Sequence, residues 1–166
     1  LGVKFTVIKK DTDESFPDIP HHEVSMYLAD KKNKSFEDDL KSNTLIITAD
    51  TIVSINEKIL NKPTNKNEAL SMLKTLSNNK HTVYTGVCIK TWQKKILFYA
   101  ATDVYFNKLS DEELNYYIET FKPYDKAGAY GVQEWMGYAG IKKIDGCFFN
   151  VMGLPLSNIY NELKKM

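Results

Sequence analysis

The chain has 166 residues, of which 43% are hydrophobic and 26% are charged, values typical of one globular domain with a substantial core. It contains no run of about 18 apolar residues and no signal-peptide pattern, so we expect no membrane span. A net charge of +1 gives no field of one sign for nucleic-acid or membrane binding. The cysteines Cys88 and Cys147 form no CxxC pair, which favours free thiols and a cytoplasmic location.

All 22 basic residues are lysines, because the sequence contains no arginine. Lysine binds phosphate as a point charge, whereas arginine offers a planar pair of donors. If the protein handles phosphates, lysines, backbone amides and a metal ion must bind them. The chain starts at Leu1 rather than at a methionine, and we expect further residues in front of it.

The first predicted elements are a strand, a loop and a helix. Lys4–Ile8 has the pattern of a short strand, and residues 9–18 form a polar loop. Pro20 opens a helix that runs to about Asn33. Its apolar face is predicted to comprise Val24, Tyr27 and Leu28.

Two strands are predicted next. The apolar run Thr44–Ala49 is typical of a buried central strand, and we expect it to end at Asp50. A second short strand, Ile52–Ile55, follows at once, and Asn56 and Glu57 form a plausible hairpin turn.

The middle of the chain contains two helices around a strand pair. Asn65 is a good N-cap for a helix with an apolar face over residues 69–76. Residues 81–92 and 95–106 are β-rich and predict an antiparallel pair. Ser110 and Glu113 match a capping box, followed by helical periodicity up to Pro123.

The last part begins with a Gly/Ala-rich loop, residues 125–131, followed by a strand at 140–144 and a terminal helix from Pro155 through Leu163. Strands and helices are interspersed along the chain. This order predicts an α/β fold in which helices cover a mixed, twisted sheet, as a single domain over residues 1–166.

Asp50 is the strongest candidate for chemistry, because a carboxylate at the end of a buried strand is well placed to hold a divalent metal or to activate water. A capping or turn role is an equal alternative. Lys62, stiffened by Pro63, is a candidate phosphate contact, and Glu14 is a candidate second metal carboxylate. For both, a solvated surface residue is the alternative.

Residues 125–131 have small side chains at most positions, which permits close approach of the backbone to a ligand, although a tight structural turn explains them equally well. Gln133 follows the loop, and its amide offers a donor and an acceptor for a base edge. The three histidines His21, His22 and His81 lack metal-site or triad spacing and are expected to be structural or exposed.

In six blocks along nearly the whole chain, the sequence resembles the Maf (septum formation) family of nucleotide pyrophosphatases. The blocks are Ala49-Asp50-Thr51, Asn61-Lys62-Pro63, residues 68–73, residues 81–87, residues 125–133 and residues 150–156. The last two blocks are highly specific. The resemblance implies a sheet flanked by helices, as in inosine triphosphate pyrophosphatase, with two lobes around a central cleft.

The resemblance also implies hydrolysis between the α and β phosphates of a nucleoside triphosphate, with Mg²⁺ or Mn²⁺ as cofactor. Asp50 matches the family's proposed general base, and with Glu14 it forms the expected acidic and metal-binding centre. Lys62 matches a phosphate-contacting lysine. Lys32 falls at the lysine of an LAxxKA pattern, although Asn33 replaces the alanine.

Thr51 and Gln133 match positions that resemble the family's specificity determinants, and the Asp-Thr pair resembles the branch that acts on dTTP and UTP. Two departures stand out. Glu134 follows the glutamine where the family usually has glycine, and the Ser-x-Ser-Pro-Arg-Arg segment expected just before Leu1 is absent from this sequence. We therefore expect an N-terminal strand and a Ser/Arg-rich loop to be missing.

Two alternative functions stay open at this point. One is a pyrophosphatase for other canonical or modified nucleotides, and the other is a nucleotide-binding regulator of septum formation with little turnover. The expected partner is a small-molecule nucleotide, with no nucleic acid and no membrane, and a homodimer is one option.

Overall fold

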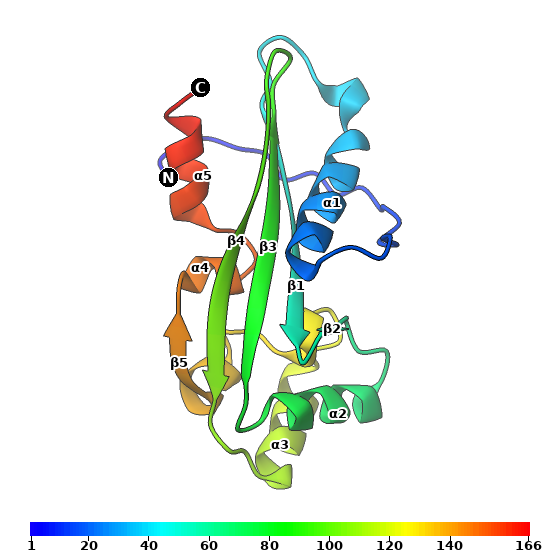
Figure 1. Cartoon of the computed structure of the whole chain (residues 1–166), viewed down its shortest axis with the longest axis vertical. Coiled ribbons are helices and arrows are strands. Elements are labelled where there is room, and N and C mark those ends of the chain that lie inside the picture. Colours follow the sequence, from blue (N-terminus) through cyan, green and yellow to red (C-terminus); the bar gives the residue numbers. More distant parts are fainter.

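A five-stranded sheet forms the centre of the molecule in the computed structural model, which describes residues 1–166 (Figure 1). The strand order is β2-β1-β3-β4-β5, and all four strand pairs are antiparallel. The strands are β1 (Ile46–Ile55), β2 (Lys58–Leu60), β3 (Lys80–Lys90), β4 (Lys95–Phe106) and β5 (Ile141–Asp145). The α/β class with flanking helices is confirmed, whereas the expected mixture of parallel and antiparallel strands is replaced by antiparallel pairing throughout.

Helices cover both faces of the long β3–β4 hairpin and one end of the sheet (Figure 1). Helix α1 packs on β1 and β3, and α4 packs on β3 and β4 from the other side. Helices α2 and α3 pack together at one end of the strands. The bounds are α1 (His21–Lys34), α2 (Lys66–Leu76), α3 (Asp111–Phe121), α4 (Phe148–Val151) and α5 (Leu156–Leu163), with short helical turns at Glu37–Asp39, Ala127–Ala129 and Met136–Gly140.

The buried apolar side chains form one large cluster and two small ones. The large cluster joins α2 and α3 to the ends of β1, β3 and β4, with Leu73 and Tyr117 fully buried. A small cluster lies under α1, and another lies under α5. The core thus concentrates at the α2–α3 end of the sheet.

The predicted caps and hairpin turn are confirmed. Asn65 accepts a hydrogen bond from the backbone N–H of Glu68 at 3.0 Å, and Ser110 and Glu113 form a complete capping box. Asn56 and Glu57 both have positive φ, at 49° and 59°, as a two-residue turn between antiparallel strands requires.

The structure corrects three expectations. Lys4–Ile8 forms no strand, and Phe5 is 81% exposed, because a β-prone segment becomes a strand only where another strand pairs with it. Residues 46–55 form one continuous strand, so Asp50 lies in its middle, opposite Gly86 of β3, and not at a strand end. Tyr27 is 40% exposed and lies off the buried face of α1.

Helix α1 lies unusually close to the sheet at Gly86. A Cβ atom at this position would overlap the backbone of Ser25 and Met26 in α1. The Thr48 hydroxyl also donates a hydrogen bond to the Ala29 carbonyl at 2.7 Å, which ties the helix to β1. Because Gly86 pairs with Asp50, this close approach sets how near the C-terminal half of α1 lies to the Asp50 carboxylate.

We predict that Gly86→Ala destabilises the protein by about 1–3 kcal/mol, because the added methyl group meets helix backbone that must shift. Urea denaturation followed by circular dichroism measures the change. Ala101→Ser, on an exposed position of β4, is the control and should change stability by less than about 0.5 kcal/mol. Equal stability of the Gly86→Ala variant and the unmodified protein would contradict the close-packing argument.

Candidate active site

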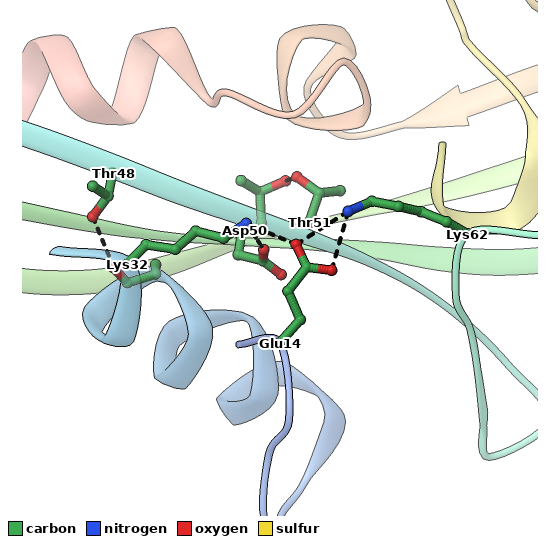
Figure 2. Close-up of polar contacts among 8 residues, drawn as sticks. Glu14, Lys32, Thr48, Asp50, Thr51 and Lys62 are labelled. Atoms are coloured by element: carbon green, nitrogen blue, oxygen red, sulfur yellow. Dashed lines mark hydrogen bonds and ion pairs between the residues drawn. The ribbon is translucent and has the colours of Figure 1, made fainter. Parts of the chain in front are cut away.

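Four charged side chains of alternating sign form a continuous chain of ion pairs (Figure 2). Lys62 Nζ lies 3.1 and 3.0 Å from the two carboxylate oxygens of Glu14. Lys32 Nζ lies 3.3 Å from Glu14 Oε1 and donates a hydrogen bond to Asp50 Oδ1. Glu14 therefore lies between two lysines, and Lys32 lies between two carboxylates.

Each member of this ion-pair chain comes from a different segment. Glu14 belongs to the irregular segment before α1, Lys32 to the last turns of α1, Asp50 to β1, and Lys62 to the stretch after β2. Asp50 is the most buried of the four, with 9% of its side chain exposed, whereas half of the Lys62 side chain is exposed. The chain thus runs from the protein interior to solvent.

Burial and the neighbouring charges shift the pKa values of these groups. Burial raises the pKa of the Asp50 carboxyl above its ordinary value, against the opposing effect of the Lys32 ammonium. Burial acts in the same sense on Glu14, but hydrogen bonds from Lys62 and the charge of Lys32 outweigh it and lower the Glu14 pKa. Burial opposes the charged form of Lys32, yet the hydrogen bond to Asp50 prevails and raises the Lys32 pKa. Lys32 therefore stays an ammonium at neutral pH.

The ion-pair chain lies in a cleft of about 520 Å³. This volume falls in the range of roughly 300–1,000 Å³ that is usual for small-molecule sites. The structure brings all the candidate residues from the sequence to this one cleft, and they are Glu14, Lys32, Asp50, Thr51, Lys62 and Gln133. Gln133 is exposed there, with its amide free to meet a ligand.

The Gly/Ala-rich loop, residues 125–131, serves as a tight turn and also borders the cleft. Gly128 has a φ of +69° and packs against Val53 of β1, where a Cβ atom would lie 3.1 Å from a Val53 methyl carbon. Its N–H donates to the Asn61 carbonyl at 3.2 Å, next to Lys62. The loop therefore positions the segment that carries Lys62.

Several residues in or beneath the cleft were not individual candidates from the sequence. Lys126 and Gly153 line the cleft, and both occur in blocks that carry the family resemblance. Thr85 is fully buried beneath Thr51, and the two hydroxyl oxygens are 2.8 Å apart. Thr85 also occurs in a block that carries the family resemblance, residues 81–87.

Glu134, the departure from the family pattern, ties the loop to α3. The Tyr117 hydroxyl donates to the Glu134 carboxylate and accepts from the Gly131 N–H at 2.9 Å. Lys126 Nζ lies 3.1 Å from Glu134 and 2.8 Å from Asp125. Through these contacts Glu134 holds the loop and places Lys126 at the wall of the cleft.

The histidines have the structural and exposed roles expected of them. The His21 ring contacts the Ser54 hydroxyl at 2.7 Å, and His22 lies half-exposed beside Glu23. His81 is buried in the large core against Tyr130, and burial lowers its pKa to about 4. It is therefore neutral in the folded protein at neutral pH.

The structure thus defines the class as an α/β protein with an antiparallel sheet and a cleft of small-molecule size, in which two lysines pair with two carboxylates. The sequence model of the family described as Maf-like protein matches residues 1–166, and the chain belongs to this family. None of its helices has the length and apolar character needed to cross a membrane.

Curated relatives cover the whole chain. A dTTP/UTP pyrophosphatase of Bacteroides thetaiotaomicron is 48% identical over 100% of this chain and 87% of its own length. The dTTP/UTP pyrophosphatase of Parabacteroides distasonis is 48% identical over 99% of this chain and 86% of its own length. A third relative of that name, from Cytophaga hutchinsonii, is 48% identical over 99% of this chain and 76% of its own length.

We predict that Glu134→Ala destabilises the protein by about 1–3 kcal/mol, because the buried Tyr117 hydroxyl loses the acceptor for its hydrogen. A double-mutant cycle with Tyr117→Phe, followed by urea denaturation, isolates this contact. The effect of Glu134→Ala should shrink in the Tyr117→Phe background. Additive effects of the two substitutions would show that the contact does not hold the loop.

Proposed function

We propose that this chain is a nucleoside triphosphate pyrophosphatase that hydrolyses dTTP and UTP to the monophosphate and pyrophosphate. The observation that carries the proposal is the Lys62–Glu14–Lys32–Asp50 ion-pair chain inside a cleft of small-molecule size. The names of relatives 48% identical over nearly the whole chain support the choice of nucleotides.

The lysines supply cationic contacts for the phosphates. Lys62 is half-exposed and Lys32 reaches the same carboxylate, so both ammonium groups face the region around Glu14. A triphosphate carries several negative charges, and phosphate oxygens compete with carboxylate oxygens for the same donors. Since Glu14 and Asp50 offset the two lysines, the four side chains together contribute no net positive charge. A further cation is needed to neutralise the substrate.

A divalent ion fits the donor set of this cleft. Glu14 and Asp50 supply carboxylate oxygens on either side of one ammonium group, while no cluster of three or more His, Cys, Asp and Glu side chains is present. Mg²⁺ is usually held by one or two carboxylates together with substrate phosphates, rather than by a complete protein cage. Glu14 and Asp50 would hold such an ion, which supplies charge neutralisation and polarises the phosphate.

In this reaction Asp50 acts as the general base. Water attacks the α phosphorus, the bond between that phosphorus and the bridging oxygen breaks, and pyrophosphate leaves. The Asp50 carboxylate orients this water and takes its proton. Lys32, bonded to Asp50, fixes the carboxylate in the cleft and stays charged while the substrate binds.

Thr51 and Gln133 supply polar contacts for the base. Both line the cleft, and the Gln133 amide can donate a hydrogen bond to a carbonyl oxygen of uracil or thymine. We also propose a cytoplasmic location, which the free cysteines Cys88 and Cys147 support. Nucleotide pools in that compartment would supply the substrate.

Pyrophosphate release from a panel of nucleoside triphosphates tests the proposal. With Mg²⁺ or Mn²⁺, we expect UTP and dTTP to be the best substrates, and EDTA to abolish release. Full activity in EDTA would contradict the metal-ion part of the proposal. Nucleotide binding without turnover would contradict the enzymatic function itself.

Asp50→Asn should lower kcat for UTP by about 10²–10⁴-fold, because the amide keeps the shape but cannot take the proton. Asp30→Asn is the matched control, since Asp30 is also largely buried and pairs with Lys95 but lies outside the cleft. Steady-state kinetics and thermal unfolding of both variants separate catalysis from stability. An Asp50→Asn variant that keeps more than about a tenth of the activity would overturn the assignment.

A further inference from the structure

A buried chain of hydrogen bonds lies beneath the Thr51 hydroxyl. Thr51 points to the opposite side of β1 from Asp50, as neighbouring residues of a strand do (Figure 2). The only hydrogen-bond partner of the Thr51 hydroxyl is the Thr85 hydroxyl, at 2.8 Å. Thr85 Oγ1 in turn donates to the Asn150 carbonyl of α4, at 3.0 Å.

The chemistry of these three groups fixes the direction of every hydrogen bond. A carbonyl oxygen can only accept, so the single hydrogen of the Thr85 hydroxyl goes to Asn150. Thr85 therefore has only lone pairs to offer Thr51, and Thr51 must donate its own hydrogen to Thr85. If Thr85 donated its hydrogen to Thr51 instead, the Thr85 hydroxyl oxygen and the Asn150 carbonyl oxygen would face each other 3.0 Å apart with no hydrogen between them.

The surroundings hold this order in place. Thr85 and Asn150 are both fully buried, so no water replaces a lost partner. The Asn150 side-chain amide donates to the Val83 carbonyl at 3.1 Å and to the Thr102 hydroxyl at 2.9 Å. Its backbone carbonyl also accepts from the Gly153 N–H at 2.9 Å. The acceptor at the end of the chain is therefore rigidly fixed.

The Thr51 hydroxyl thus has no hydrogen left for a ligand and offers only lone pairs. Thr51 is partly exposed and lines the cleft. A Cβ atom at Gly153 would lie 3.5 Å from Thr51 Oγ1. Because glycine lacks this atom, the space beside the Thr51 hydroxyl stays open. A ligand group that reaches Thr51 must bring the hydrogen itself.

We propose that Thr85 is a positioning residue that holds the Thr51 hydroxyl as an obligate acceptor, so that the cleft selects a base with a ring N–H. This inference rests on the proposed function. Uracil and thymine carry such an N–H between two carbonyl groups, whereas the corresponding ring nitrogen of cytosine has no hydrogen. With cytosine, the Thr51 hydroxyl oxygen and the ring nitrogen would both be acceptors, and their repulsion would disfavour binding.

Thr85→Val tests the inference, because valine keeps the shape of threonine and frees the Thr51 hydrogen to point into the cleft. We expect the ratio of kcat/KM for UTP to that for CTP to fall by about 10-fold or more. Thr85→Ser keeps the hydroxyl and should restore the ratio. Since Thr85 acts through Thr51, the double variant Thr51→Val/Thr85→Val should show the same ratio as Thr51→Val alone.

Thr102→Val is the control for stability, because it removes a partner of Asn150 without touching Thr51 or Thr85. It should lower the unfolding temperature and keep the ratio. If Thr85→Val leaves the UTP/CTP ratio of kcat/KM unchanged, the inference is overturned. It is also overturned if Thr85→Val changes only the preference for UTP over dUTP, because Thr51 would then contact the sugar and not the base. Lack of UTP hydrolysis by the unmodified protein would instead refute the proposed function.

Discussion

Helix α1 rests directly on β3 because residue 86 carries no side chain, and the geometry of the cleft follows from this approach. Asp50 lies opposite Gly86 in the neighbouring strand, so the helix that passes over Gly86 carries Lys32 to the Asp50 carboxylate. The hydrogen bond from Thr48 to α1 fixes the same helix one turn further along. A bulkier residue at position 86 would push α1 outward and separate the groups that must act together.

The alternating charges of the ion-pair chain stabilise lysines and carboxylates side by side in a partly buried cleft. An isolated buried charge is costly, but each charge here has an opposite partner. Glu14 lies between the two lysines as a carboxylate, with oxygen acceptors of the same kind as a phosphate group. The site is thus ordered before a substrate arrives, and less conformational freedom is lost when one binds.

Successive side chains of β1 point to opposite faces of the strand, so neighbouring residues contribute to different parts of the cleft. Asp50 faces α1 and the lysines, whereas its neighbour Thr51 faces Thr85 and α4. The first side is suited to phosphate and water, and the second to an uncharged hydrogen-bonding group. The Asp-Thr pair therefore joins elements from the first and last thirds of the chain, which explains why the segment around Asn150 matters to the site.

The sequence by itself determined the elements with strong local signals, namely the caps at Asn65 and Ser110, the Asn56-Glu57 turn and the long β3–β4 pair. The resemblance in the blocks around Asp50, Lys62 and Gln133 also pointed to residues that the fold brings into one cleft. Local pattern failed for Lys4–Ile8 and for the position of Asp50 within β1, because strand formation depends on a pairing partner, and β3, the partner of β1 at Asp50, lies more than 25 residues further along the chain. The sharing of Glu14 between two lysines and the hydrogen-bond order beneath Thr51 were decided only by the tertiary structure, since their partners lie between 18 and 65 residues apart and nothing local in the sequence specifies such contacts.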